Sequence, residues 1–424
     1  HTICALGTCM IICGALIKEN AIQQYFLQKY YFYIESGNNI KTLFERVPDE
    51  LPRVFRARSP YQKIDIVDDP SSDLSAAIMP AYSTKLQEYP NYPSQRILFL
   101  NGDFQTNSTF DEVYHEYFAH VPIIARGVVP EKILVLGGGD GILIRELTKY
   151  SEIKSITHVD LDETLINLAK TNKRLLEINH GSLNDPRVHG IISDGYQFVR
   201  STDQTFDAIY IDFPVPVDYD LSKLYSREFF TFIRKRITET GFAVFDATGI
   251  GLLSPFDLND EQTISPLNDW PYYYNTLRAA GFRAITPYLS NLELDNPQAS
   301  EILTQEGTPL ALPIEFLRAV RFANNRFEAL AMQRAFTQAI SRSVIEDHVF
   351  TLQQGFIIMN HQSSLLGREY QEFSANYNLM NAQRFKRAFM YKFSQPSEID
   401  YSKVNSIMRP TFPTTPTWKP RLPY

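Results

Sequence analysis

The sequence predicts an α/β protein built around an open, largely parallel β-sheet. A short apolar run at residues 133–136 leads into a glycine-rich turn, and helical patterns then alternate with further apolar runs. Acidic residues follow three of these runs. Short apolar runs of this kind are typical of strands buried on both faces, and ligands bind beyond the carboxyl ends of such strands.

The glycine-rich turn at residues 137–141 reads GGGDG and lies between a predicted strand and a predicted helix. Glycines permit a tight turn and the close approach of a ligand, and a helix start offers free N–H groups. A second strand at residues 155–159 ends in Asp160, where a carboxylate can accept hydrogen bonds from two ribose hydroxyls. These features predict a ligand that carries a nucleoside.

Asp140 lies inside the glycine turn, where a pyrophosphate would meet its negative charge. A carboxylate at that place repels phosphate and favours a cationic ligand. The alternative is that Asp140 only caps the following helix, as Asp often does.

The composition is that of an ordinary globular protein of 424 residues with a formal net charge of -7. Since no long run of Lys and Arg offsets the acids, we expect no nucleic-acid partner. The cysteines, Cys4, Cys9 and Cys13, all lie near the start of the sequence, so the body has no internal disulfide framework. This usage is compatible with the cytosol.

The segment 1–17 contains an uncharged apolar stretch, Ile3–Ile17, that is shorter than the ~20 residues needed to cross a bilayer. We interpret it as the end of a transmembrane helix, followed over residues 18–58 by a juxtamembrane helix and a connector. A signal-peptide core and a buried helix are the alternatives. A real span would place the protein at the cytoplasmic face of the inner membrane, and otherwise it is cytoplasmic.

Later segments follow from their periodicity. Alternating residues predict a small antiparallel sheet over 59–108, which with a helix at 111–128 gives an N-terminal β-domain and linking helix, 59–122. The parallel sheet occupies 123–290, a helical insertion 291–354, and a last strand with a C-terminal tail 355–424. The remaining predicted strands are 188–192, 206–211, 242–245, 284–287 and 355–359, and the remaining helices are 163–178, 226–238 and 313–340.

Three successive strand ends of the predicted sheet carry carboxylates, namely Asp160, Asp194 and Asp212. Carboxyl ends of parallel strands meet at one edge, so these acids predict the reactive site. A turn-shaping role is the alternative for Asp194. His115 and His120 are one residue too far apart for a metal motif of the HExxH type, and we expect no metal.

Several blocks of the sequence together are specific enough to indicate a family. They are SPYQKI (59–64), LNGDFQ (100–105), DEVYHE (111–116), LVLGGGDG (134–141), HVDLDETL (158–165), LNDPRV (183–188), SDGYQFV (193–199), FDAIYID (206–212) and KLYSREFF (223–230). The ordered set resembles the polyamine aminopropyltransferases, the spermidine synthase family, and most closely its bacterial members that follow a membrane-spanning region.

This resemblance implies a Rossmann-like, class I methyltransferase-type sheet of seven strands, with a small N-terminal antiparallel β-domain and a helical insertion. It implies transfer of an aminopropyl group from decarboxylated S-adenosylmethionine, a co-substrate, to a diamine, with no tightly bound cofactor. The expected partner is a small amine, with membrane attachment through the N-terminal segment and a homodimer as an open alternative.

The resemblance also assigns roles to matching residues. In the donor site Asp160 would hold the ribose, and Asp194 with Gly195 the adenine amine. The further donor-site residues that it implies are Gln62, His115, Gly137, Gly139, Gln105 and Asp140, the last two at the aminopropyl end. Asp212, helped by Tyr114, would act on the attacking amine.

Two departures concern the acceptor amine. The family usually has two acids in an Asp-x-x-Asp-Pro block, whereas Val215 stands in the second place here. The Tyr-containing loop that usually covers the diamine has no clear equivalent in Leu289–Gln298. Putrescine, giving spermidine and methylthioadenosine, is the default expectation. The alternatives are an S-adenosylmethionine-dependent N-methyltransferase and a non-catalytic, membrane-tethered protein that binds nucleosides or polyamines.

Overall fold

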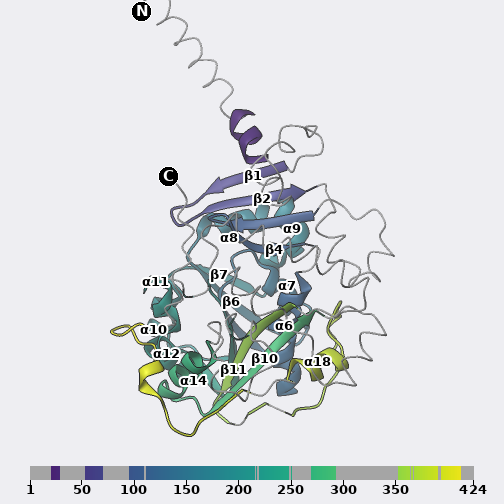
Figure 1. Ribbon diagram of the computed structural model, residues 1–424. Helices are drawn as coiled ribbons and strands as arrows, with labels where there is room; N and C mark the ends of the chain where they lie inside the picture. The colour runs from purple at the N-terminus through teal and green to yellow at the C-terminus, as the bar shows by residue number, and fades with distance from the viewer. Residues whose placement is uncertain are drawn as a thin grey trace, which may run out of the picture. The chain divides into compact units, whose positions relative to one another are not determined.

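A computed structural model gives the fold of the chain (Figure 1). The structure describes residues 21–28, 53–69, 95–108, 111–214, 216, 219–247, 250, 269–292, 352–362, 364–365, 367–389 and 393–411. The chain divides into two compact units, of which the first holds the described residues up to 108 and the second those from 111 onward. Each unit is described by itself.

The first unit contains a four-stranded antiparallel sheet in the order β1-β2-β3-β4. Its strands are β1 (Arg53–Arg58), β2 (Lys63–Asp69), β3 (Gln95–Leu100) and β4 (Asp103–Asn107). Asn101 and Gly102 both have positive φ angles and form the two-residue turn between β3 and β4. The small antiparallel sheet was predicted, but β1 lies in residues that were assigned to a connector. Its mixed charges, such as Arg56 paired with Asp65 on β2, concealed the alternation that identifies a strand.

A short helix at residues 21–28 belongs to the same unit. Its Leu27 packs in an apolar cluster with Val54, Val67, Ile97 and Phe99 of the sheet. Ile22, Tyr25 and Phe26 on the helix are exposed.

The second unit contains a seven-stranded sheet in the order β10-β11-β9-β8-β5-β6-β7. Its strands are β5 (Lys132–Gly137), β6 (Ser155–Asp160), β7 (Val188–Ile192), β8 (Phe206–Asp212), β9 (Ile237–Asp246), β10 (Ala284–Leu292) and β11 (Leu352–Asn360). The strands from β5 to β9 are parallel to their neighbours, while β11 pairs antiparallel with both β9 and β10. The predicted fold class, a Rossmann-like methyltransferase-type sheet beside a small antiparallel sheet, is confirmed.

Helices cover both faces of this sheet (Figure 1). On one face, α12 (Arg227–Arg236) and α14 (Trp270–Ala279) pack in a large apolar core with alternate residues of the strands, such as Ile209 and Phe245. The intervening strand residues face the other way. There the hydroxyl of Tyr210 donates to the carbonyl of Ala119 on α6 (Glu112–Arg126), 2.9 Å away. Helix α6 therefore covers the opposite face.

Two predicted helices differ in their bounds. The helix expected over residues 163–178 is two helices, α8 (Glu163–Thr171) and α9 (Lys173–Asn179). Asn172 separates them because its backbone is extended and its side chain accepts a hydrogen bond from the N–H of Arg174, which caps α9. The helix expected over 226–238 ends at Arg236, and β9 begins at the next residue.

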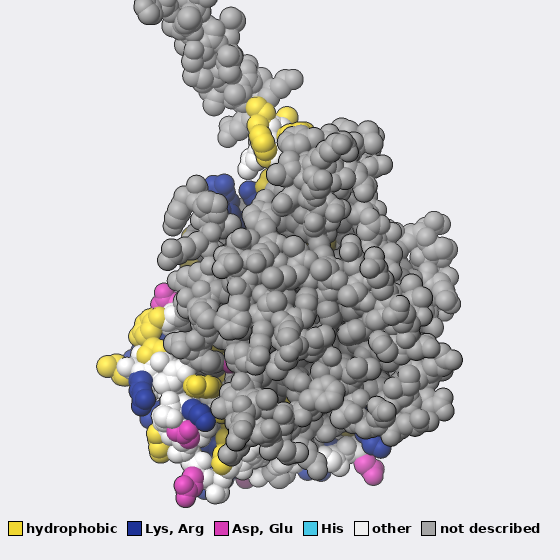
Figure 2. Space-filling model, in the orientation of Figure 1, with side chains coloured by type: hydrophobic (Ala, Val, Ile, Leu, Met, Phe, Trp, Pro, Cys, Tyr) yellow, Lys and Arg dark blue, Asp and Glu magenta, His cyan; other side chains and the backbone are white. Residues whose placement is uncertain are grey.

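Some predictions fall outside the described residues. They are the apolar segment 1–17, the helix 313–340, Val215, most of the acceptor loop 289–298 and the end of the C-terminal tail from 412. Within the described ranges, no helix combines the length and the apolar character required to cross a bilayer. On the face that Figure 2 shows, basic and acidic side chains of the described residues are intermingled rather than gathered by sign.

Candidate active site

The carboxyl ends of the parallel strands bring four acidic side chains to one edge of the sheet. Across the order β9-β8-β5-β6, Asp246 ends β9, Asp212 ends β8 and Asp160 ends β6. Gly137, which ends β5, pairs with Asp212, and the glycine turn carrying Asp140 follows it. The prediction concerned Asp160, Asp194 and Asp212. The strand order places Asp212 and Asp160 on either side of the glycine turn, and Asp194 follows β7, the neighbour of β6.

The glycine turn passes directly over two of these carboxylates. A methyl group added at Gly138, which has a φ of 65°, would lie 2.8 Å from Asp212 Oδ2. One added at Gly139 would lie 2.9 Å from Asp160 Oδ2. Side chains at either position would occupy the space beside the acids, so the glycines keep main chain, carboxylates and any ligand within close reach.

Asp160 is held by the backbone that follows it. Its Oδ1 accepts a hydrogen bond from the N–H of Asp162 at 2.7 Å. Burial raises its pKa from 3.8 to about 6, and the charges of Asp162 and Asp140 add to this effect. A ligand that donates hydrogen bonds, as the two hydroxyls of a ribose do, would stabilise the ionised form of this carboxylate.

Asp212 is contacted by a side chain of helix α6. The hydroxyl of Tyr114 on α6 donates to Asp212 Oδ1 at 2.8 Å and lies 3.5 Å from Asp246 Oδ2. Burial, followed by the charge of Asp140, raises the pKa of Asp212 to about 8, although the Tyr114 hydrogen bond opposes the rise. An acid with a pKa near physiological pH suits a group that accepts a proton during a reaction.

Two of the predicted residues also have structural roles. Asp140 Oδ1 accepts from the N–H of Ile142, and Asp194 Oδ1 accepts from the N–H of Tyr196 at 2.7 Å. Asp194 is thus the N-cap of α10 (Gly195–Ser201). Since a methyl group at Gly195 would lie 2.8 Å from the ring of Phe213, this helix start is packed against the residue after Asp212.

His115 follows Tyr114 on α6, and their rings lie 4.9 Å apart in an edge-to-face arrangement. Its Nδ1 lies 3.0 Å from the carbonyl oxygen of Asp111. Burial lowers the pKa of His115 below 6.5. The negative charge of Asp140 is the largest effect that opposes this lowering. His115 is therefore a neutral, buried group on the side of α6 near the glycine turn.

Gln62 and Gln105 belong to the first unit. Gln62 lies in the turn before β2, where its N–H donates to Ser59 Oγ at 3.0 Å, and Gln105 is exposed on β4. The other predicted residues all lie in the second unit. They are Tyr114, His115, Gly137, Gly139, Asp140, Asp160, Asp194, Gly195 and Asp212.

Two further residues at this edge were missed from the sequence. Asp246 ends β9 just as Asp212 ends β8, and extending the strand-end rule by one strand would have found it. Tyr225 is buried, and its hydroxyl donates to the carbonyl oxygens of Phe213 and Pro214 at 3.0 and 3.2 Å. Tyr225 therefore holds the backbone directly after Asp212 in place. No pattern in the sequence around Tyr225 indicates this role.

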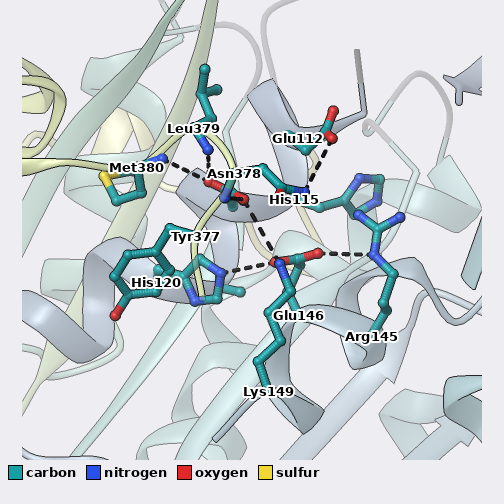
Figure 3. Close-up of polar contacts among 12 residues, drawn as sticks. Glu112, His115, His120, Arg145, Glu146, Lys149, Tyr377, Asn378, Leu379 and Met380 are labelled. Atoms are coloured by element: carbon teal, nitrogen blue, oxygen red, sulfur yellow. Dashed lines mark hydrogen bonds and ion pairs between the residues drawn. The ribbon is translucent and has the colours of Figure 1, made fainter. Parts of the chain in front are cut away.

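A second polar cluster is formed by side chains of α6 and α7 (Ile142–Thr148) (Figure 3). Ligand atoms of Glu116, His120 and Glu146 lie within 4.8 Å of one another, as metal ligands do. However, Glu146 Oε2 contacts His120 Nε2 at 2.9 Å and Lys149 Nζ at 2.5 Å, and Glu146 Oε1 accepts from Arg145 Nε. Burial alone would raise the pKa of Glu146, but these partners lower it.

Glu116 is satisfied by backbone instead. Its Oε1 accepts from the N–H of Asn378 at 2.5 Å, and its Oε2 accepts from the N–H groups of Leu379 and Met380 at 2.8 and 2.7 Å (Figure 3). Positively charged side chains and N–H donors of the protein thus satisfy the carboxylates of this cluster. Glu116 also holds residues 378–380 against α6. The oxygens of the cluster are engaged in a way that does not fit a metal site.

The sheet and its line of strand-end acids define a Rossmann-like, methyltransferase-type α/β protein. A family model described as Spermine/spermidine synthase domain matches residues 111–279. The matched residues include every acid of the site described above.

Curated relatives support the same family. Over 232 residues the chain is 33% identical to a polyamine aminopropyltransferase of Oceanobacillus iheyensis, covering 55% of this chain and 41% of the relative. Over 147 residues it is 40% identical to one from Sulfurisphaera tokodaii, covering 34% of this chain and 48% of the relative. The chain thus matches less than half the length of these relatives.

A solved spermidine synthase, crystallised in complex with the transition-state analogue AdoDATO, is similar in fold. It aligns with a TM-score of 0.51 and 18% identity, over 80% of this chain and 86% of that one. At this identity the likeness concerns the fold alone.

Proposed function

We propose that the protein transfers an aminopropyl group from decarboxylated S-adenosylmethionine to an amine. The observation that carries this proposal is the Asp212–Tyr114 pair, whose hydrogen bond of 2.8 Å lies at the end of β8 beside the glycine turn. The synthase domain over residues 111–279 and its relatives named polyamine aminopropyltransferases support the same reaction.

The donor would lie along the acids from β6 to β5. Asp160 would accept the ribose hydroxyls, and the N-cap at Asp194 would lie near the adenine. Asp140, whose charge acts on both Asp212 and Asp160, would face the positively charged aminopropyl tail. The carboxylate of ordinary S-adenosylmethionine would be repelled by Asp140, so the decarboxylated donor is favoured.

The reaction needs a neutral amine held in line with the methylene group beside the sulfonium. Amines of this kind arrive protonated, because their pKa lies near 10 (compare ~10.4 for lysine). Asp212 in its ionised form would accept that proton. The nitrogen lone pair then forms the new C–N bond, the C–S bond breaks, and its electrons leave with sulfur as neutral methylthioadenosine.

Tyr114 would orient this step. Its hydroxyl holds Asp212 Oδ1, and burial together with the charges of Asp212 and Asp246 raises the pKa of Tyr114 well above 10. It therefore remains a hydrogen-bond donor throughout. Putrescine is the proposed default acceptor, with spermidine as the product.

The test is an assay of the purified full chain with decarboxylated S-adenosylmethionine and a panel of mono-, di- and polyamines. We expect release of methylthioadenosine with at least one diamine. A parallel reaction with ordinary S-adenosylmethionine reports methyl transfer as S-adenosylhomocysteine. Absence of methylthioadenosine with every amine would refute the proposal, and S-adenosylhomocysteine formation in its place would favour a methyltransferase.

A further inference from the structure

We propose that Asp246 binds the ammonium group of the acceptor that does not react, and so makes the enzyme select diamines. This inference rests on the proposed function. Asp246 lies in the same register as Asp212, because β8 and β9 are parallel neighbours and Ile211 pairs with Phe245. The two carboxylates thus end adjacent strands, whose spacing is ~4.8 Å.

The order of the strands gives the acceptor a direction. Asp160 lies at the end of β6, the glycine turn follows β5, and Asp212 and Asp246 follow on β8 and β9. A donor held at Asp160 and the glycine turn presents its electrophilic carbon toward Asp212. The part of the acceptor that does not react must then extend away from the donor, which is toward β9.

The four residues after Asp212 are Phe-Pro-Val-Pro, and none of them supplies an acid for that distal group. Asp246 comes instead from the neighbouring strand. One tyrosine hydroxyl lies close to both Asp246 and Asp212. The Tyr114 hydroxyl lies 2.8 Å from Asp212 Oδ1 and 3.5 Å from Asp246 Oδ2.

Aromatic rings accompany the two acids. The ring of Tyr114 lies 5.4 Å from that of Phe356, which is the β11 residue paired with Asp246. Phe356 is fully buried and stacked by Phe118 and Tyr288, so Tyr114 is the ring that lies beside both acids. Two carboxylates beside a tyrosine ring match an acceptor with a cation at each end of a short aliphatic chain.

Electrostatics support this arrangement. The charge of Asp246 contributes to the raised pKa values of Asp212, Tyr114 and Tyr225, so it acts on the same small region. A second ammonium would relieve the repulsion between Asp246 and Asp212 and favour the ionised form of Asp212 that accepts the proton.

The experiment compares 1,4-diaminobutane with butylamine, which has the same chain and one amine, in wild type and Asp246→Asn. We expect KM for the diamine to rise about tenfold to a hundredfold, the usual effect of losing a hydrogen bond to a charged group, while kcat changes less. The KM of butylamine, or its inhibition constant if it is not turned over, should stay within about twofold. Asp203→Asn, at an exposed acid, is the control.

A purely structural role for Asp246 would weaken both amines alike, and that result, or an unchanged diamine KM, would overturn the inference. Asp246→Glu gives a second test should the Asn variant not fold. The added methylene should shift preference from 1,4-diaminobutane toward 1,3-diaminopropane, and an unshifted preference would count against the anchor. A wild type that releases no methylthioadenosine with any amine contradicts the proposed function itself.

Discussion

Asp212 links the proposed chemistry to stability at the level of one residue. Burial raises its folded-state pKa from 3.8 to about 8, so the folded protein holds a proton that the unfolded chain releases. Its contribution to the free energy of unfolding is therefore fully present below about pH 4 and is lost as pH rises through about 8. Ligand cations that favour the ionised carboxylate oppose this loss.

We predict that Asp212→Asn flattens the decline of stability between about pH 4 and about pH 8, because the amide does not titrate. Chemical denaturation at several pH values measures this for the variant and the wild type. Asp203→Asn, at a side chain on the surface, should follow the wild-type profile. A decline that is equally steep in Asp212→Asn would show that Asp212 does not carry the raised pKa.

The glycine turn gives a second prediction at the residue scale. Gly138→Ala should lower both thermal stability and donor binding, because the new methyl group would lie 2.8 Å from Asp212 Oδ2. Gly367→Ala is a matched control, since Gly367 also has a positive φ, 74°, but meets nothing within 4 Å. The positive φ costs each variant roughly 1 kcal/mol, so the difference between them measures the collision. Equal melting temperatures and equal methylthioadenosine affinities would contradict the prediction.

At the scale of elements, helix α6 joins the site to the C-terminal segment. The hydroxyl of Tyr114 donates to Asp212. Glu116, two residues later, accepts hydrogen bonds from the backbone N–H groups of Asn378, Leu379 and Met380. A buried carboxylate with three donors is a strong anchor. The segment therefore helps to hold the helix that positions Tyr114.

We predict that Glu116→Gln lowers the free energy of unfolding by at least about 2 kcal/mol, because the amide nitrogen faces donors and cannot accept from them. Hydrogen exchange at residues 378–380 should accelerate in parallel. Glu112→Gln is the control on the same helix, since Glu112 accepts a hydrogen bond from the Asn378 side chain, at 3.4 Å. Unchanged exchange in Glu116→Gln would show that the contact does not hold the segment.

Elements also show where local sequence is informative. Apolar runs predicted β5, β6, β8 and β9 because these strands are largely buried on both faces. The strand β7 was also predicted, although none of its residues is fully buried. The break at Asn172 was missed because the leucines on either side continue the helical spacing, while the extended backbone at Asn172 depends on its cap. Periodicity detects which face is buried and is insensitive to a single interrupted residue.

At the scale of the whole molecule, the charge balance affects the cationic acceptor. The formal net charge is -7, and two acids at the proposed acceptor site add a local attraction. Raising the salt concentration screens such attraction over ~10 Å at 0.1 M.

We predict that kcat/KM for a diamine falls several-fold between ~0.05 and ~0.5 M salt, because the screening length shortens over this range. The fall should be smaller for a monoamine. Inhibition by methylthioadenosine, a neutral molecule, serves as the control and should change little. A diamine rate that is independent of salt would contradict a role for these charges in capturing the acceptor.

The sequence by itself determined the α/β class, the glycine turn and the acids at Asp160, Asp194 and Asp212, because each is a local consequence of a strand followed by a turn. Only the tertiary structure decided which strands are neighbours. That order sets Asp246 beside Asp212, with the Tyr114 hydroxyl close to both. Packing of the chain brings Glu116 to a backbone segment more than 260 residues away. Both contacts depend on strand order and chain packing, which hydrophobic periodicity does not encode.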